Sequence, residues 1–170
     1  MSDTTWVGSP HFTEGRKSYK PEAVVIHIAE GSRSAVDAWF QISEPPVSAH
    51  YLVCTDGSLH QYVHEKDTAW HAGRVVRPTW AGIKTGPSGA PVNPNYYTIG
   101  IEHEGHTGVP FTAAMLERTA GLLAAISKRH AIPLDRTHVI GHCEIFAPKP
   151  FCPGAGVDLD ALIALAVHHT

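Results

Sequence analysis

Short apolar runs and longer amphipathic segments alternate along this chain. Residues 22–31 (EAVVIHIAEG) form a β-branched run that ends in glycine, which predicts a buried strand. Residues 97–105 predict a second strand, and residues 137–140 predict a short third one. Alternation in the second strand places Ile99 and Ile101 on one face, while the opposite face carries Thr98, Gly100, Glu102 and Glu104.

Residues 47–65 predict a β-hairpin. Two short strands flank Asp56-Gly57, a pair that is typical of two-residue hairpin turns. The first of these strands carries Val47, Ala49, Tyr51 and Val53 on one face, and Ser48, His50, Leu52 and Cys54 on the other. One face of this strand is therefore unusually polar.

Three amphipathic segments predict helices. Apolar residues at 35, 36, 39 and 40 predict a helix with Ser34 as its N-cap, ended by Glu44-Pro45. The longest predicted helix covers 111–132, with Thr112 as its cap, and a closing helix covers 158–168. Strands and helices in this mixed order favour an α/β fold, with a mixed central β-sheet flanked by helices in a single domain over residues 1–170.

Two segments show no regular pattern. Residues 1–20 are polar and predicted to be irregular, and residues 74–95 are rich in proline and glycine. A loop as long as 74–95 is often functional in a compact domain, although a disordered surface insert has the same composition. Trp80 in its middle indicates that part of it packs against the rest of the molecule.

Composition excludes several partner classes. The chain has 170 residues, 43% of them hydrophobic, and a formal net charge of −3, which offers no general attraction to nucleic acid or anionic membranes. No apolar run approaches the roughly 20 residues of a membrane span, so no membrane insertion is predicted. The N-terminus lacks the basic and then apolar pattern of a signal peptide, which predicts synthesis in the cytoplasm, and we expect a monomer.

The three cysteines, Cys54, Cys143 and Cys152, are an odd number without paired spacing. They do not predict a disulfide framework. Buried thiols in a reducing compartment are the ordinary interpretation, and we apply it to Cys54 and Cys143.

The stretch 139–154 (VIGHCEIFAPKPFCPG) carries the candidate chemistry. His142 and Cys152 stand ten positions apart, too far to share one face of a helix. Prolines at 148, 150 and 153 can bend the loop so that both side chains meet. Imidazole and thiolate ligands that meet in this way suit zinc.

A catalytic zinc site needs a third protein ligand, a proton acceptor and a group for the developing oxyanion. His27 is a candidate ligand, although a histidine inside a strand is more often a hydrogen-bonded core residue. Glu102 is the candidate acceptor, because it lies deep in an otherwise apolar run. Lys149 is the candidate cation.

Five segments together resemble a known family. They are, in order, VVIHIAEG, VSAHYLVCTDG, TAWHAG, NPNYYTIGIEHEG and GHCEIFAPKPFCPG. At these residues the chain resembles the zinc-dependent N-acetylmuramoyl-L-alanine amidases of type 2, which share their fold with peptidoglycan recognition proteins. The resemblance covers roughly residues 23–165.

The resemblance implies Zn²⁺ as the cofactor and peptidoglycan as the partner. It implies His27, His142 and Cys152 as the metal ligands and Glu102 as the catalytic glutamate. Lys149 matches less closely, because the family's lysine stands two residues before the third ligand, where this chain has Pro150. A one-residue insertion brings Lys149 into that position, with His50 as the substitute if Lys149 is displaced.

Other residues have competing interpretations. Cys143 could replace Cys152 as the ligand, but it is adjacent to His142, and neighbouring side chains tend to point apart. His50, Tyr51, Trp70 and His71 are predicted to bind substrate at the cleft, with simple packing as the alternative for each. His103 and Glu104 are predicted to face away from Glu102 or toward solvent.

The resemblance implies hydrolysis of the amide between N-acetylmuramic acid and L-alanine. Cys152 and the Ala147-Pro148-Lys149 string favour a phage or prophage endolysin, a bacteriolytic and antimicrobial enzyme that acts on the cell wall after release during host lysis. A cytosolic recycling amidase acting on soluble anhydro-muropeptides is the alternative. A non-catalytic peptidoglycan-binding module is a third possibility, although such modules commonly lack a zinc ligand.

Overall fold

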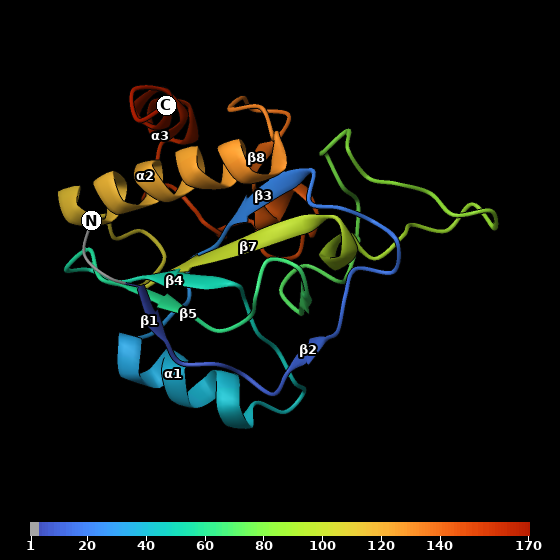
Figure 1. Ribbon diagram of the computed structural model, residues 1–170, viewed down its shortest axis with the longest axis horizontal. Coiled ribbons are helices and arrows are strands. Elements are labelled where there is room, and N and C mark those ends of the chain that lie inside the picture. Colours follow the sequence, from blue (N-terminus) through green and yellow to red (C-terminus); the bar gives the residue numbers. More distant parts are fainter. Residues whose placement is uncertain (1–3) are drawn as a thin grey trace.

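The molecule is built on one six-stranded sheet. Figure 1 shows the computed structural model, which describes residues 4–170. The strands of the sheet are β1 (Thr4–Trp6), β3 (Ala23–Ile26), β4 (Tyr51–Val53), β5 (Leu59–Gln61), β7 (Thr98–His103) and β8 (Val139–Gly141). They lie in the order β1-β5-β4-β7-β3-β8. The four strands β4, β7, β3 and β8 are parallel, whereas β5 runs antiparallel to β4, so the predicted mixed sheet is confirmed.

The hairpin prediction is also confirmed. Tyr51 pairs with Gln61 and Val53 with Leu59, and the turn between them contains Asp56-Gly57. Gly57 has a φ of +81°, a conformation that glycine adopts without the strain a side chain would add.

The prediction that residues 1–20 are irregular is wrong for two segments. β1 adds a parallel strand beside β5 at the edge of the sheet, and β2 (Phe12–Thr13) pairs with β6 (Thr68–Ala69) in a small second sheet. Strands of two or three residues are too short to show an alternating pattern, so tertiary pairing determines them. Residues 1–3 of the predicted segment lie outside the described residues.

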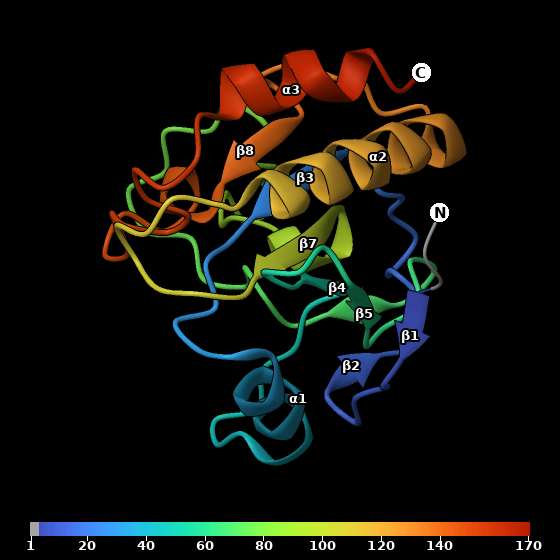
Figure 2. The ribbon, with the colours of Figure 1, turned by 90° about the vertical axis from the view of Figure 1, so that its left-hand side faces the viewer.

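Two helices cover one face of the sheet, as Figure 2 shows: α2 (Ala113–His130) and α3 (Leu159–Val167). The core under them combines Ile26, Ile99 and Ile101 of the sheet with Met115, Leu123 and Ile126 of α2 and Leu162 of α3. Thr112 caps α2, as predicted, because its hydroxyl accepts the Met115 N–H at 3.1 Å. His103 at the end of β7 faces this layer and contacts Thr119 at 2.8 Å, away from Glu102 as predicted.

The opposite face carries α1 (Arg33–Ile42), which packs Val36 and Phe40 in a cluster with Leu52 and Tyr62. The prediction of Ser34 as the N-cap is wrong. Ser32 accepts the Ala35 N–H, and the helix begins at Arg33. The chain offers two serines two positions apart, and local sequence does not distinguish which hydroxyl meets the free N–H groups.

The segment 74–95 packs on the sheet through Trp80, which is 7% exposed. The Trp80 indole N–H donates to the Thr137 carbonyl at 2.8 Å, and its ring stacks on Tyr97. The segment ends in the short 3-10 helix η1 (Pro94–Tyr96). Trp80 therefore packs this segment against the sheet, as predicted, while the tip of the segment projects from the body in Figure 1. Neither the functional-loop nor the surface-insert interpretation is decided by this arrangement.

Candidate functional site

Three neighbouring parallel strands bring the candidate residues together. Ile26 of β3 pairs with Ile101 of β7 on one side and with Gly141 of β8 on the other. The next residues along the three strands are therefore His27, Glu102 and His142. These side chains meet on the α1 side of the sheet, because Val24, Ile26, Ile99 and Ile101 fill the opposite face.

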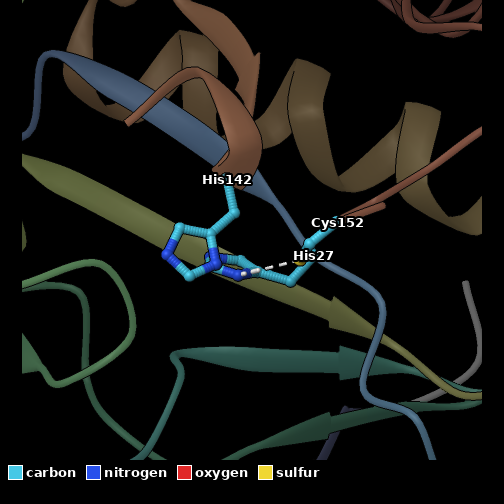
Figure 3. Close-up of side chains that lie close together, drawn as sticks. All are labelled: His27, His142 and Cys152. Atoms are coloured by element: carbon cyan, nitrogen blue, oxygen red, sulfur yellow. Dashed lines mark hydrogen bonds between the residues drawn. The ribbon is translucent and has the colours of Figure 1, made fainter. Parts of the chain in front are cut away.

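Cys152 completes the cluster from the loop that follows β8. The 3-10 helix η2 (His142–Glu144) starts this loop, and the loop folds back so that the Cys143 N–H donates to the Cys152 carbonyl at 2.8 Å. Cys152 Sγ then lies 3.8 Å from His27 Nδ1, the contact dashed in Figure 3. One ligand atom from each of His27, His142 and Cys152 lies within 4.8 Å of the others.

The cluster is buried, and its burial sets the charge of each member. His27 is 2% exposed, and His142 and Cys152 are each 7% exposed. Burial, with the nearby positive groups, holds the pKa of His27 well below its usual value, and burial and Lys149 lower the pKa of His142 to about 4. Burial, followed by the charge of Glu102, raises the pKa of the Cys152 thiol to about 12. The protein thus offers two neutral imidazoles and a thiol that a bound cation would convert to a thiolate.

An unsatisfied nitrogen tests whether these residues fit a metal ion. His142 Nδ1 is buried and has no hydrogen-bond partner among the described residues. Buried polar atoms are nearly always paired, so an orphaned imidazole nitrogen beside a second histidine and a cysteine indicates a missing ligand. The donor set of two nitrogens and one sulfur suits Zn²⁺.

Glu102 stands beside the cluster as a potential proton acceptor. Its Oε1 lies 3.8 Å from His27 Nδ1, and its Oε2 is buried without a partner among the described residues. Burial raises the pKa of Glu102 to about 7, although the positive charge of Lys149 opposes this shift. A carboxyl group with this pKa can both accept and return a proton near neutral pH.

The cluster opens into a cavity of about 420 Å³ that lies between α1 and the loop after β8. Lys149 lines it, as do the predicted substrate-binding residues Trp70 and His71. Residues of α1 form another part of its wall, among them Val36, Trp39 and Phe40, and sequence reasoning missed this role. The sequence offered no signal for this role, because the half-exposure of Trp39 on the apolar stripe of α1 is seen only in the structure.

His50 and Tyr51, in contrast, do not line the cavity. His50 is fully buried, and its Nδ1 accepts the Gly100 N–H at 3.0 Å while its Nε2 lies 2.9 Å from Arg16 Nη2. The Tyr51 side chain belongs to the core under α2, and its hydroxyl donates to Glu65 at 2.8 Å. The structure therefore gives neither residue a contact with a substrate in the cavity, nor does it place His50 where it could substitute for Lys149.

Sequence comparison identifies the family to which this arrangement belongs. Residues 17–155 match the family model described as N-acetylmuramoyl-L-alanine amidase. The chain belongs to this family. The amidase is 36% identical over 135 residues to N-acetylmuramoyl-L-alanine amidase A of Achromobacter lyticus, a match that covers 78% of the chain and 66% of that relative.

Further relatives match along nearly their whole length. The 1,6-anhydro-N-acetylmuramyl-L-alanine amidase AmpD of Haemophilus influenzae is 28% identical, with 96% of this chain and 92% of that protein covered. A crystal structure of a selenomethionine AmpD derivative superimposes with a TM-score of 0.76 at 28% identity, covering 97% of this chain and 95% of that one. A mutant endolysin from Bacillus subtilis shares the fold with a TM-score of 0.65, but its 18% identity, with 100% of each chain covered, bears on the fold alone.

These comparisons confirm an amidase that acts on peptidoglycan material through the amide between N-acetylmuramic acid and L-alanine. They also confirm the predicted fold. The more specific prediction of an endolysin finds no specific support in them, because the relatives with the higher identities are an amidase A and AmpD proteins. Within the described part of the chain, no helix is both long and apolar enough to cross a membrane.

Proposed function

We propose that this chain is a zinc-dependent amidase that cleaves soluble 1,6-anhydro-muropeptides. The observation that carries the proposal is the buried cluster of His27, His142 and Cys152, with its orphaned imidazole nitrogen, beside the buried Glu102. The choice of a soluble substrate rests on the AmpD proteins, which match this chain over nearly its full length.

In this proposal His27, His142 and Cys152 hold the zinc ion. Bound zinc would polarise the amide carbonyl and lower the pKa of a water molecule. Three protein ligands leave a fourth position open, as catalytic zinc sites require. The burial of all three side chains excludes bulk water from the ion on the protein side.

Glu102 would act as the general base and then as the general acid. It takes a proton from the attacking water and returns it to the amine of L-alanine as the amide bond breaks. A pKa of about 7 suits both steps at neutral pH, and the unpaired Oε2 is free to make the necessary contact.

Lys149 would stabilise the oxyanion that develops on the carbonyl oxygen. Its side chain lines the cavity, and after burial its positive charge helps to lower the pKa of His142, while it opposes the rise that burial causes in the pKa of Glu102. A preorganised cation in a site with little water stabilises a developing negative charge more strongly than it would in bulk solvent.

The test compares two substrates for the zinc-loaded protein. Purified soluble anhydro-muropeptides and intact insoluble sacculi are incubated with it, and the products are weighed by mass spectrometry. We expect release of the L-alanyl peptide from the soluble substrate and little release from sacculi. Efficient release of stem peptides from sacculi would instead support the endolysin prediction, and cleavage of neither would leave a binding module.

A further inference from the structure

We infer that His71 and Thr98 form a hydrogen-bond chain that fixes the tautomer of His27 and so keeps its Nδ1 free to bind the metal. This inference rests on the proposed zinc site, which it extends to residues that hold no metal themselves. His71 is a positioning residue in this account, rather than a residue that binds substrate.

The chain of contacts is continuous. His27 Nε2 lies 3.0 Å from His71 Nδ1, and His71 Nε2 lies 3.3 Å from Thr98 Oγ1. Thr98 Oγ1 in turn lies 2.8 Å from the Pro94 carbonyl oxygen. Each of the two rings therefore uses both of its nitrogens, one toward the metal cluster and one toward the interior.

The contact between Thr98 and Pro94 determines which atom donates the proton in each of the other hydrogen bonds. A carbonyl oxygen can only accept, so the Thr98 hydroxyl proton points to Pro94 and Thr98 Oγ1 must accept from His71. His71 is then protonated on Nε2 and unprotonated on Nδ1, and its Nδ1 accepts a proton from His27 Nε2. His27 is therefore left with a lone pair on Nδ1, the atom that faces Cys152 Sγ and Glu102 Oε1 at 3.8 Å each.

The reverse assignment of donors and acceptors along this hydrogen-bond chain conflicts with the geometry. A proton passed from Thr98 toward His27 would place two acceptors, Thr98 Oγ1 and the Pro94 carbonyl, against each other at 2.8 Å. It would also put a proton on His27 Nδ1, where a metal ligand needs a lone pair. A histidine that binds zinc commonly has its other ring nitrogen fixed by such a second partner.

The surroundings hold His71 in one place. The backbone N–H groups of His71 and Ala72 donate to the Asn95 side-chain oxygen at 3.2 and 2.7 Å. The His71 ring lies against the backbone of Gly100, where an added Cβ would come within 2.5 Å of it. Thr98 is fully buried, so water does not compete for its hydroxyl.

The direct test is the tautomer of His27 in the zinc-free protein, read from the ¹⁵N shifts of its two ring nitrogens by NMR. We expect the neutral form with the proton on Nε2. A proton on Nδ1 would overturn the inference, whatever the enzyme's activity. Because this readout needs no metal and no substrate, it is independent of whether the proposed function is correct.

Substitutions then test the consequence for zinc. His71→Leu removes the acceptor, and we expect zinc affinity, measured by competition with a chromophoric chelator, to fall about 10- to 100-fold. His71→Asn places an amide oxygen near the position of Nδ1 and should restore most of that affinity. Thr98→Val should release the tautomer of His71 and lower zinc affinity by a smaller factor.

His64→Leu is the matched control, because His64 is exposed and stacks on Trp6 at the edge of the sheet. It should leave zinc affinity unchanged and so exclude a general effect of removing one of thirteen histidines. An unchanged zinc affinity in His71→Leu, with a raised KM, would show instead that His71 binds substrate. A wild-type enzyme that binds zinc but cleaves no muropeptide would contradict the proposed function while leaving the tautomer result intact.

Discussion

Glu102 shows how one side chain obtains its chemistry from its position. The same carboxyl group on the solvated face of a strand would be ionised and inert. Here burial raises its pKa to about 7 and leaves Oε2 without a partner among the described residues. Two substitutions, at Glu102 and at Cys152, can therefore test proton transfer and metal binding separately.

Glu102→Gln should keep the metal and lose most of the rate. The amide has nearly the shape of the carboxyl group, but it cannot accept a proton, so we expect a fall of about 10²- to 10⁴-fold in kcat/KM. Zinc content is measured on the same sample by atomic absorption. A variant with full zinc and near-wild-type turnover would remove Glu102 from the mechanism.

Cys152→Ala should lose the zinc itself. Two imidazoles alone bind zinc much more weakly than the three-ligand set, and the thiolate is the ligand that the site's charge balance needs. Cys143→Ala is the matched control, because Cys143 is adjacent in sequence to His142 but outside the cluster of ligand atoms. Zinc loss in Cys143→Ala with zinc kept in Cys152→Ala would reverse the assignment of the third ligand.

At the scale of elements, the segment 74–95 illustrates how one aromatic residue orders a stretch that lacks periodicity. Trp80 belongs to a buried apolar cluster with Tyr97, Ile140 and Ile145, and its indole N–H donates to the carbonyl of Thr137, in the turn before β8. The same segment leads through η1 to Pro94 and Asn95, whose carbonyl and side-chain oxygens accept hydrogen bonds from the Thr98 hydroxyl and the His71 backbone N–H. Its packing is therefore linked to the site.

Trp80→Ala should destabilise the protein by about 3 kcal/mol, because it removes a buried aromatic ring and leaves a cavity. Trp39→Ala is the matched control, since Trp39 is 50% exposed on α1 and its loss should change the free energy of unfolding little. Urea unfolding of both variants measures the difference. Equal destabilisation by the two substitutions would show that the loop packs loosely around Trp80.

The sequence was most informative where the controlling interaction is local. Thr112 caps α2 because the hydroxyl and the N–H it accepts are three residues apart, and the Asp56-Gly57 turn is equally local. β1 and β2 were missed because their pairing partners lie more than fifty residues away. The choice of Ser32 over Ser34 as a cap depends on a difference of a few ångströms that no pattern expresses.

The functional site also combines features that local sequence predicts with features that depend on distant contacts. His27, Glu102 and His142 meet because β7, β3 and β8 are neighbours in the sheet, an order that spacing alone does not reveal. The family resemblance implied the roles of the three residues but not this order. Alternation already placed His50 and Tyr51 on opposite faces of one strand, so both could not line one cleft. The contact between His71 and His27 joins segments 44 residues apart and became visible only in the structure.

At the scale of the whole molecule, several histidines with lowered pKa values make the stability of the folded state depend on pH. Burial lowers the pKa of His71 to about 3, and of His103 and His142 to about 4. In the unfolded chain each would titrate near 6.5. Below that pH the unfolded state binds protons that the folded state does not, so the stability of the folded state must fall.

The zinc-free protein should therefore lose stability as pH falls from about 6.5 toward 4, whereas stability should change little from this source above 6.5. His103 lies on the α2 face of the sheet, opposite the face on which the ligand side chains meet, and its ring contacts the His27 carbonyl and Thr119 Oγ1. A pKa shift from 6.5 to about 4 corresponds to a loss of roughly 3 kcal/mol for this one group.

Chemical unfolding at pH 7.0 and 5.0 measures the effect in the wild type and in His103→Gln. The substitution should lower stability at pH 7.0, because packing and hydrogen bonds are lost, but it should reduce the difference between the two pH values. His64→Gln removes an exposed histidine and should leave that difference as it is in the wild type. If His103→Gln and His64→Gln show the same pH dependence as the wild type, His103 must titrate alike in the folded and unfolded states, and its burial would not make the fold sensitive to acid.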